Sequence, residues 1–177
     1  MRNQMTVHTA ISREVFFSER ELIVSKTDLK GRITYANKTF CKVAGYTEHE
    51  ILGQPHSLVR HPEMPRAIFK LLWDTISNGR EIFAYVKNLT KTGDYYWVFA
   101  HVTPSFDRDG KIIGYHSNRR TPKRAVIEKA ITPLYARILA EEARHKNGKE
   151  ALAAGVECLT TVLTTKGLDY EAFVLTL

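Results

Sequence analysis

Residues 21–37 read ELIVSKTDLKGRITYAN, and this stretch decides the fold. Its first seven residues, Glu21 to Thr27, are of types that favour β-strands, and Arg32 to Ala36 alternate between apolar and polar side chains. Between them the sequence DLKG, residues 28–31, supplies a turn that ends in glycine. The pattern predicts a β-hairpin whose second strand ends at Asn37.

Helices are predicted directly after this hairpin. Apolar residues recur at helical spacing from Asn37 until Gly45, and residues 47–50, TEHE, are typical of a capping box. A longer helix is predicted from Pro62 to Ser77, because apolar residues recur on one of its faces and proline suits the first helical position.

Strand patterns return after the longer helix. Residues 81–90, 95–106 and 111–120 are rich in aromatic and β-branched residues, and turn sequences at 91–94 and 107–110 separate them. The sequence therefore predicts an α+β fold, in which a five-stranded antiparallel sheet carries helices on one face.

A different pattern begins after Pro122. Apolar residues step by three and four positions on both sides of a break at Asn147-Gly148, which predicts two amphipathic helices that form an antiparallel hairpin or a dimer seam. Pro133 lies inside the first helix and is expected to kink or restart it. We therefore divide the chain into an N-terminal cap (1–20), a central domain (21–121) and a C-terminal helical extension (122–177).

Composition excludes several classes of protein. The chain has 177 residues, of which 44% are hydrophobic and 25% charged, so it is neither a disordered tail nor a fibre. It has no apolar run long enough to span a bilayer and no secretory signal, and its two cysteines fit no zinc or disulfide pattern, so we expect a cytoplasmic protein without a metal site.

The net charge of +7 raises the question of nucleic-acid binding. The basic residues Arg119, Arg120, Lys123 and Arg124 form only one short cluster, and no helix-turn-helix pattern accompanies them. We therefore expect no nucleic-acid partner. An acidic or membrane-proximal protein partner fits the basic stretch from Arg119 to Lys149 better.

Residues 56–65, HSLVRHPEMP, form the most informative polar stretch. The unpaired amides at the start of the predicted helix, together with Arg60, His61 and His56, would make a pocket for an anion such as a cofactor pyrophosphate. The alternative is that Arg60 and His61 only cap the preceding turn.

Separated motifs in this order resemble a known family. Residues 27–37, with Phe40, Gly45-Tyr46 and residues 51–55, resemble the opening of a PAS domain. The motifs that resemble, more narrowly, the PAS sensor of the aerotaxis (energy-taxis) receptors are VRHPEMP at 59–65, Phe69, Trp73, VKN at 86–88, KTGDYYWV at 91–98 and Gly114-Tyr115. The match covers roughly residues 21–121. It implies a PAS fold that holds FAD non-covalently and reports the redox state of the cell to a chemotaxis signalling module.

The resemblance also implies cofactor-binding residues. Arg60, His61, Trp73 and Asn88 stand where the family motifs place residues of the cofactor pocket, although Trp73 would equally suit plain core packing. Asn37 and Asn88 carry amides that could bind the edges of a flavin ring, or could bond to local backbone instead.

Tyr96 and Trp97 point to opposite faces of a strand, and of the two we take Trp97 to face the cofactor. Two departures from the family pattern accompany these residues. Glu63 replaces the usual aspartate, and Leu89-Thr90 replaces a basic pair, so no phosphate contact is transferred to that pair.

The resemblance implies signalling rather than catalysis. No Ser-His-Asp set, paired carboxylates, HExxH motif or phosphate-binding glycine loop is present, so we expect no catalytic residues and no enzyme activity. The chain ends without the membrane and signalling segments of aerotaxis receptors. We therefore expect a homodimer that acts on a separate methyl-accepting chemotaxis-type protein, through which it would associate peripherally with the membrane.

Other PAS domains bind haem or a small ligand, bind no cofactor, or form a flavin–cysteine adduct in blue light. A haem- or small-ligand-binding domain could use His56, His61, His101 or His116 as a ligand. A cofactor-free dimerisation module is favoured only by Leu89-Thr90. Blue-light adduct chemistry is not expected, because Cys41 lies outside the motif that this chemistry requires.

Overall fold

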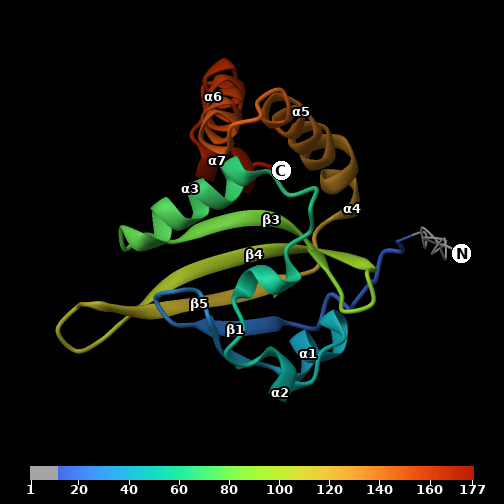
Figure 1. Ribbon diagram of the computed structural model, residues 1–177, viewed down its shortest axis with the longest axis vertical. Coiled ribbons are helices and arrows are strands. Elements are labelled where there is room, and N and C mark those ends of the chain that lie inside the picture. Colours follow the sequence, from blue (N-terminus) through green and yellow to red (C-terminus); the bar gives the residue numbers. More distant parts are fainter. Residues whose placement is uncertain (1–11) are drawn as a thin grey trace, which may run out of the picture.

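The computed structural model describes residues 12–177, and its centre is a five-stranded antiparallel sheet (Figure 1). The strands are β1 (Ile23–Thr27), β2 (Ile33–Ala36), β3 (Ile82–Leu89), β4 (Tyr95–Phe106) and β5 (Ile112–Arg120). They lie in the order β2-β1-β5-β4-β3, with every neighbouring pair antiparallel. The predicted fold class is confirmed.

The N-terminal hairpin forms because its turn is held by one carboxylate. Asp28 Oδ1 accepts hydrogen bonds from the backbone N–H groups of Lys30 and Arg32, both at 2.8 Å. Gly31 has φ of +76°, a value that a residue with a side chain rarely adopts. A Cβ at Gly31 would also lie 3.0 Å from the Trp73 ring, so this glycine lets the turn approach a helix closely.

Strand alternation gives the sheet two different faces. The face that carries Val86, Asn88 and Ala100 is called the inner face here, and the face that carries Tyr85 and Trp97 is called the outer face. Four helical segments cover the inner face: α1 (Lys38–Ala44), α2 (Glu48–Ile51), the 3-10 helix η1 (His56–Val59) and α3 (Arg66–Ser77).

Local signals set the ends of these helices. The capping box predicted at 47–50 is confirmed, because the Thr47 hydroxyl accepts from the Glu50 N–H and the Glu50 carboxylate accepts from the Thr47 N–H. The predicted start of the longer helix at Pro62 is wrong, since α3 begins at Arg66. Pro65 explains the difference: a proline disfavours helical geometry in the residue before it, so no helix runs through Met64, and Pro65 itself is the extended N-cap of α3.

The C-terminal extension consists of α4 (Arg124–Val126), the π-helical turn η2 (Ile127–Ile131), α5 (Thr132–Ala143), α6 (Gly148–Lys166) and α7 (Tyr170–Leu175). Pro133 has no N–H for the helical ladder, and the π-helical turn ends two residues before it, at Ile131. This is the irregularity that the sequence predicts near Pro133. The predicted break is also confirmed, because Asn147 caps α6 with its side chain on the Lys149 N–H at 2.8 Å.

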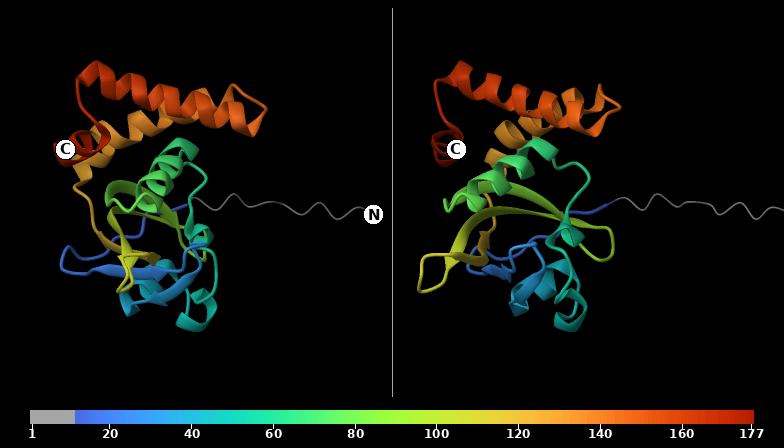
Figure 2. Two further views of the ribbon diagram at one scale, coloured as in Figure 1. Left: turned by 90° about the vertical axis from the view of Figure 1, so that its left-hand side faces the viewer. Right: turned by 60° about the vertical axis from the view of Figure 1, so that its left-hand side comes forward.

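The extension packs against the central domain at two places. Helices α5 and α6 form a helical hairpin, and α6 lies beside α3 (Figure 2). On the outer face, the Tyr135 hydroxyl of α5 donates to the Tyr85 carbonyl at 2.6 Å, and the Tyr135 ring lies 6.2 Å from the Trp97 ring. No helix within residues 12–177 combines the length and the apolar character needed to cross a bilayer.

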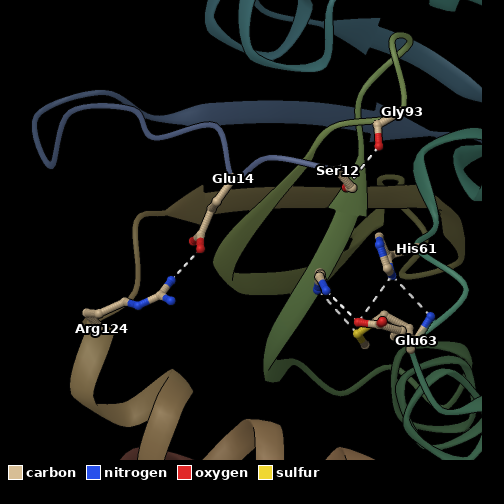
Figure 3. A network of polar contacts seen from close by, with 8 residues as sticks. Ser12, Glu14, His61, Glu63, Gly93 and Arg124 are labelled. Atoms are coloured by element: carbon tan, nitrogen blue, oxygen red, sulfur yellow. Dashed lines mark hydrogen bonds and ion pairs between the residues drawn. The ribbon is translucent and has the colours of Figure 1, made fainter. Parts of the chain in front are cut away.

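The chain segment before β1 pairs with the start of β4. Val15 N–H donates to the Tyr95 carbonyl at 2.7 Å, and Tyr95 N–H donates to the Arg13 carbonyl at 2.9 Å. Glu14 forms an ion pair with Arg124 at the start of α4, which joins this segment to the extension (Figure 3). Residues 1–11 of the predicted cap lie outside the described residues, and the boundaries at 20 and 121 stay predictions.

Candidate ligand-binding site

A cavity of about 460 Å³ lies between the inner face of the sheet and α3. Val86, Ala100 and Val102 line it from the strands, and Leu72 and Ile76 line it from the helix. A cavity of this volume with apolar walls and few polar groups is typical of small-molecule sites.

The charged groups of this cavity all have one sign. Its basic side chains are Lys30, Arg60, Arg66, Lys70 and Arg119, and within residues 12–177 no aspartate or glutamate lines it. Lys30, Arg66 and Lys70 are exposed, whereas Arg119 is only 2% exposed. The arrangement suits a ligand with an apolar ring system and negative charge.

Arg119 is the most deeply buried cation of the site. It lies on β5, its guanidinium carbon stands 4.4 Å from the centre of the Phe40 ring, and Nη2 donates to the hydroxyl of Ser25. Nε and Nη1 are buried and have no hydrogen-bond partner among the described residues. Burial lowers the pKa of Arg119 to about 10, so the side chain is charged at neutral pH.

Sequence reasoning did not single out Arg119, because it grouped Arg119 with Arg120 in one short basic cluster. Arg119 is buried and Arg120 is exposed. Period-two alternation could have found the difference, since Tyr115, Ser117 and Arg119 share one face of β5 and Arg120 does not.

Ser25 connects Arg119 to His56. The Ser25 hydroxyl lies 3.2 Å from His56 Nε2 and accepts from the arginine, so its own proton is available to the imidazole. Burial, followed by the charge of Arg119, lowers the pKa of His56 to about 3. The histidine is therefore neutral, and the single cation of this cluster is Arg119.

The structure brings three of the six predicted site residues to the cavity: Arg60, Trp73 and Asn88. The Arg60 guanidinium lies 4.2 Å above the centre of the Phe69 ring, and its Nη2 donates to the Met64 carbonyl at 3.2 Å. Trp73 is 37% exposed and stands edge-on to Tyr115, with ring centres 5.5 Å apart. Asn88 is buried on the inner face of β3.

His61 lies outside the cavity. Its Nδ1 accepts from the Glu63 N–H at 3.1 Å (Figure 3). Its ring packs edge-on to Tyr95. Burial, with the nearby charge of Lys87, lowers the pKa of His61. Glu63 pairs with Lys87, so the glutamate that replaces the family's aspartate makes its contacts away from the cavity.

Asn37 and Trp97 also lie away from the cavity. Asn37 Oδ1 accepts from the N–H groups of Phe40 at 2.9 Å and Val24 at 3.1 Å, and Nδ2 donates to the Leu22 carbonyl at 2.7 Å. Its amide is thus used to join α1 to β1. Trp97 and the cavity-lining Ala100 are three positions apart on β4, and residues an odd number of positions apart lie on opposite faces of a strand. Trp97 therefore lies on the outer face, so the choice of Trp97 over Tyr96 does not agree with the structure.

The anion site expected at the start of the longer helix is already occupied by a carboxylate of the chain. Glu142 of α5 accepts from the N–H groups of Arg66 at 3.1 Å and Ala67 at 2.9 Å. Glu142 is 8% exposed, and a Cβ on Gly155 of α6 would lie 2.5 Å from its Oε1. Any phosphate of a ligand must therefore be held by basic side chains rather than by these amides.

Comparison with known proteins identifies the class to which this fold belongs. A family model described as PAS fold matches residues 33–119, so this part of the chain is a PAS domain. The chain is 49% identical over 115 residues to the aerotaxis receptor of Escherichia coli (strain K12), a match that covers 64% of this chain and 22% of the receptor. The predicted resemblance to the PAS domain of the aerotaxis receptors is thus confirmed.

Two more distant matches are one protein sequence and one solved structure, and the solved structure shows the same fold. The chain is 28% identical over 102 residues to the nitrogen fixation regulatory protein of Klebsiella pneumoniae, covering 58% of this chain and 21% of that protein. The light-state structure of the blue-light photoreceptor Aureochrome1 LOV matches with a TM-score of 0.56 at 23% identity, covering 63% of this chain and 89% of that one. The chain spans about a fifth of the length of the aerotaxis receptor and of the nitrogen fixation regulatory protein.

Proposed function

We propose that this chain is a redox-sensing PAS module that binds FAD in the cavity between the sheet and α3. The observation that carries the proposal is the cavity itself, which combines apolar walls with five basic side chains and, within residues 12–177, no carboxylate. The identity to the aerotaxis receptor supports a role in taxis.

The residues of the cavity fit the parts of FAD. The walls formed by Val86, Val102 and Leu72 suit the flat isoalloxazine ring, and Asn88 provides an amide with both a donor and an acceptor for a ring edge. Exposed Lys30 and Arg66 at the rim suit the pyrophosphate. Bound FAD would supply reversible electron transfer.

We propose that the C-terminal extension carries the signal. Glu142 caps α3, and Leu152 of α6 is itself part of the cavity wall, so a change in the cavity reaches the extension by direct contact. The signal requires that two arrangements of these helices bind a partner differently. The partner we propose is a separate methyl-accepting chemotaxis-type protein in the cytoplasm, approached by a homodimer of this chain.

The first experiment identifies the ligand. The protein is purified, its visible spectrum is recorded, and the chromophore is extracted and identified by mass. FAD is the expected result. A Soret band would favour the haem alternative with His56 in the cavity, and a colourless protein that cannot be reconstituted with FAD would favour the cofactor-free module.

A second measurement tests the role of the basic rim. The affinity of the ligand-free protein for FAD is expected to fall as ionic strength rises, because exposed cations are screened over about 10 Å at 0.1 M salt. Riboflavin has no phosphate, so its affinity is expected to change little. Equal salt dependence of the two ligands would contradict the proposed placement of the pyrophosphate.

The signalling part is tested by binding of the partner. The signalling domain of a methyl-accepting protein is captured with the oxidised protein and with the dithionite-reduced protein. A difference in affinity between the two states is expected. Equal affinity would refute redox signalling to that partner while leaving FAD binding intact.

A further inference from the structure

Arg119 has a buried charge that no carboxylate among residues 12–177 pairs with. Two of its nitrogens, Nε and Nη1, have no hydrogen-bond partner among residues 12–177, and its one polar contact is the neutral hydroxyl of Ser25. A buried cation normally has an anion or a full set of acceptors, because removing it from water is costly. Such a group in the wall of a cavity indicates that the ligand supplies the missing partner.

We propose that Arg119 binds an electron-rich edge of the ligand and favours the state of that ligand in which the edge is negatively charged. This inference rests on the proposed function, and it assigns to Arg119 the isoalloxazine ring of FAD rather than the pyrophosphate.

Burial supports the assignment to the ring. Arg119 is 2% exposed and lies against Phe40, whereas Lys30, Arg66 and Lys70, which also line the cavity, are exposed. The phosphates of a dinucleotide are the part that stays closest to water, so the exposed cations are their natural partners. The buried end of the cavity is left for the ring, because Arg119 is the only buried lysine or arginine among the described residues that line the cavity.

The neighbours of Arg119 leave its charge intact. His56 is neutral because burial and Arg119 itself lower its pKa to about 3, and Ser25 only accepts from the guanidinium. The buried hydroxyl of Tyr96 also lies in the field of Arg119, and burial raises its pKa, so Tyr96 is neutral as well. Arg119 thus supplies one positive charge, which matches the single negative charge that a flavin ring gains when it takes up two electrons and one proton. A cation held beside the ring nitrogens is one of the groups by which a protein sets flavin electronics.

The test compares neutral and charged replacements of Arg119. Arg119→Gln and Arg119→Met remove the charge, Arg119→Lys keeps it, and Arg120→Gln is the matched control, because Arg120 is the exposed neighbour on the same strand. The midpoint potential of the bound flavin is measured against a reference dye during dithionite titration. Melting temperatures of the ligand-free proteins are measured as well.

In the neutral variants, the ratio of oxidised to reduced bound flavin is expected to rise about tenfold relative to the wild type. This corresponds to a fall of about 30 mV in the midpoint potential of a two-electron couple. The midpoint potential of Arg119→Lys is expected to lie close to that of the wild type, and that of Arg120→Gln is expected to equal it. Neutral variants that fold but lose flavin, while Arg119→Lys retains it, would equally support binding of the ring by this charge.

Three results would overturn the inference. The first is an unchanged potential in a neutral variant that holds flavin. The second is a ligand-free Arg119→Met protein that is clearly less stable than the wild type, because a charge without a partner should be replaceable by an apolar side chain of similar size. The third is a wild-type protein that binds no flavin, and only this result overturns the proposed function too.

Discussion

Asn37 and Asn88 carry the same side chain, but the fold gives them different surroundings. The amide of Asn37 is bonded to three backbone groups, which belong to β1, to Leu22 just before β1 and to α1, and it is not among the residues that line the cavity. Asn88 is buried in β3 and lines the cavity. The resemblance to the family could not separate the two residues, because hydrogen bonding within the chain decides which amide is left for a ligand.

Replacing Asn37 tests its role in joining α1 to β1. We expect Asn37→Ala to lower the free energy of unfolding by about 2 kcal/mol, because the helix loses its N-cap and two strand contacts. Urea denaturation measures this loss. The flavin affinity of the folded variant should equal that of the wild type, whereas Asn88→Ala should weaken flavin binding, and the opposite pattern would show that Asn37 is the ligand-binding amide.

His56 should make stability depend on pH. Its pKa is about 3 in the folded protein against 6.5 for an ordinary histidine, because of burial and the charge of Arg119. The unfolded chain therefore binds an extra proton between these values, and stability is highest above pH 6.5 and is lost as pH falls toward 3.

The slope from this one group is at most about 1.4 kcal/mol per pH unit. Urea denaturation from pH 7 to 4.5 measures it above the range in which most carboxylates titrate. His56→Gln should reduce the slope, although His61, whose pKa is also lowered, will keep part of it. An unchanged slope in His56→Gln would contradict the burial of a neutral imidazole.

Helix α3 shows what decides the start of an element. Pro65 sets the position of its first residue, but Pro65 offers no capping side chain, and the cap comes from Glu142 in another helix. The strands, the hairpin and the capping box at 47–50 follow from signals within a few residues, so the sequence predicted them. The cap of α3 joins residues 75 positions apart, and no local pattern could reveal it.

Glu142 should therefore stabilise α3 from a distance. We expect Glu142→Ala to lower the free energy of unfolding by about 2 kcal/mol and Glu142→Gln by about 1 kcal/mol, because the amide oxygen keeps one acceptor but not the charge. Hydrogen exchange at the N–H groups of Arg66 and Ala67 should quicken. The matched control is Glu141→Gln, which removes only a surface pair with Arg144 and should cost less than about 0.5 kcal/mol.

At the scale of the whole molecule, the C-terminal extension completes the central domain. Glu142 caps the cavity helix, Leu152 lines the cavity, and Tyr135 covers Trp97 on the outer face. Because α5 covers the outer face, Trp97 is buried there although it lies away from the cavity. Aromatic residues of the strands are therefore buried on both faces of the sheet, and their burial does not tell which of them face the cavity. The net charge of +7 did not predict that the charged side chains of the cavity are basic, because it is summed over the whole chain.

Shortening the chain tests this dependence. A protein that ends at Thr121 should have a free energy of unfolding at least about 3 kcal/mol lower than that of the full chain, because it exposes the outer face and leaves α3 without its cap. A protein that ends at Lys146 keeps Glu142 and Tyr135 and should be intermediate. Urea denaturation and flavin affinity are the measurements, and equal values for all three chains would show that the extension is an independent unit.

The unpaired nitrogens of Arg119 carry a consequence for the amount of this protein in a cell. A ligand that binds only the native chain stabilises it by about 2.7 kcal/mol at a hundred times its dissociation constant. Intracellular proteases remove the unfolded fraction, so chains made without ligand should be degraded faster than chains that hold it. Cellular supply of the ligand would then set how many copies of the sensor exist, separately from the redox state that each copy reports.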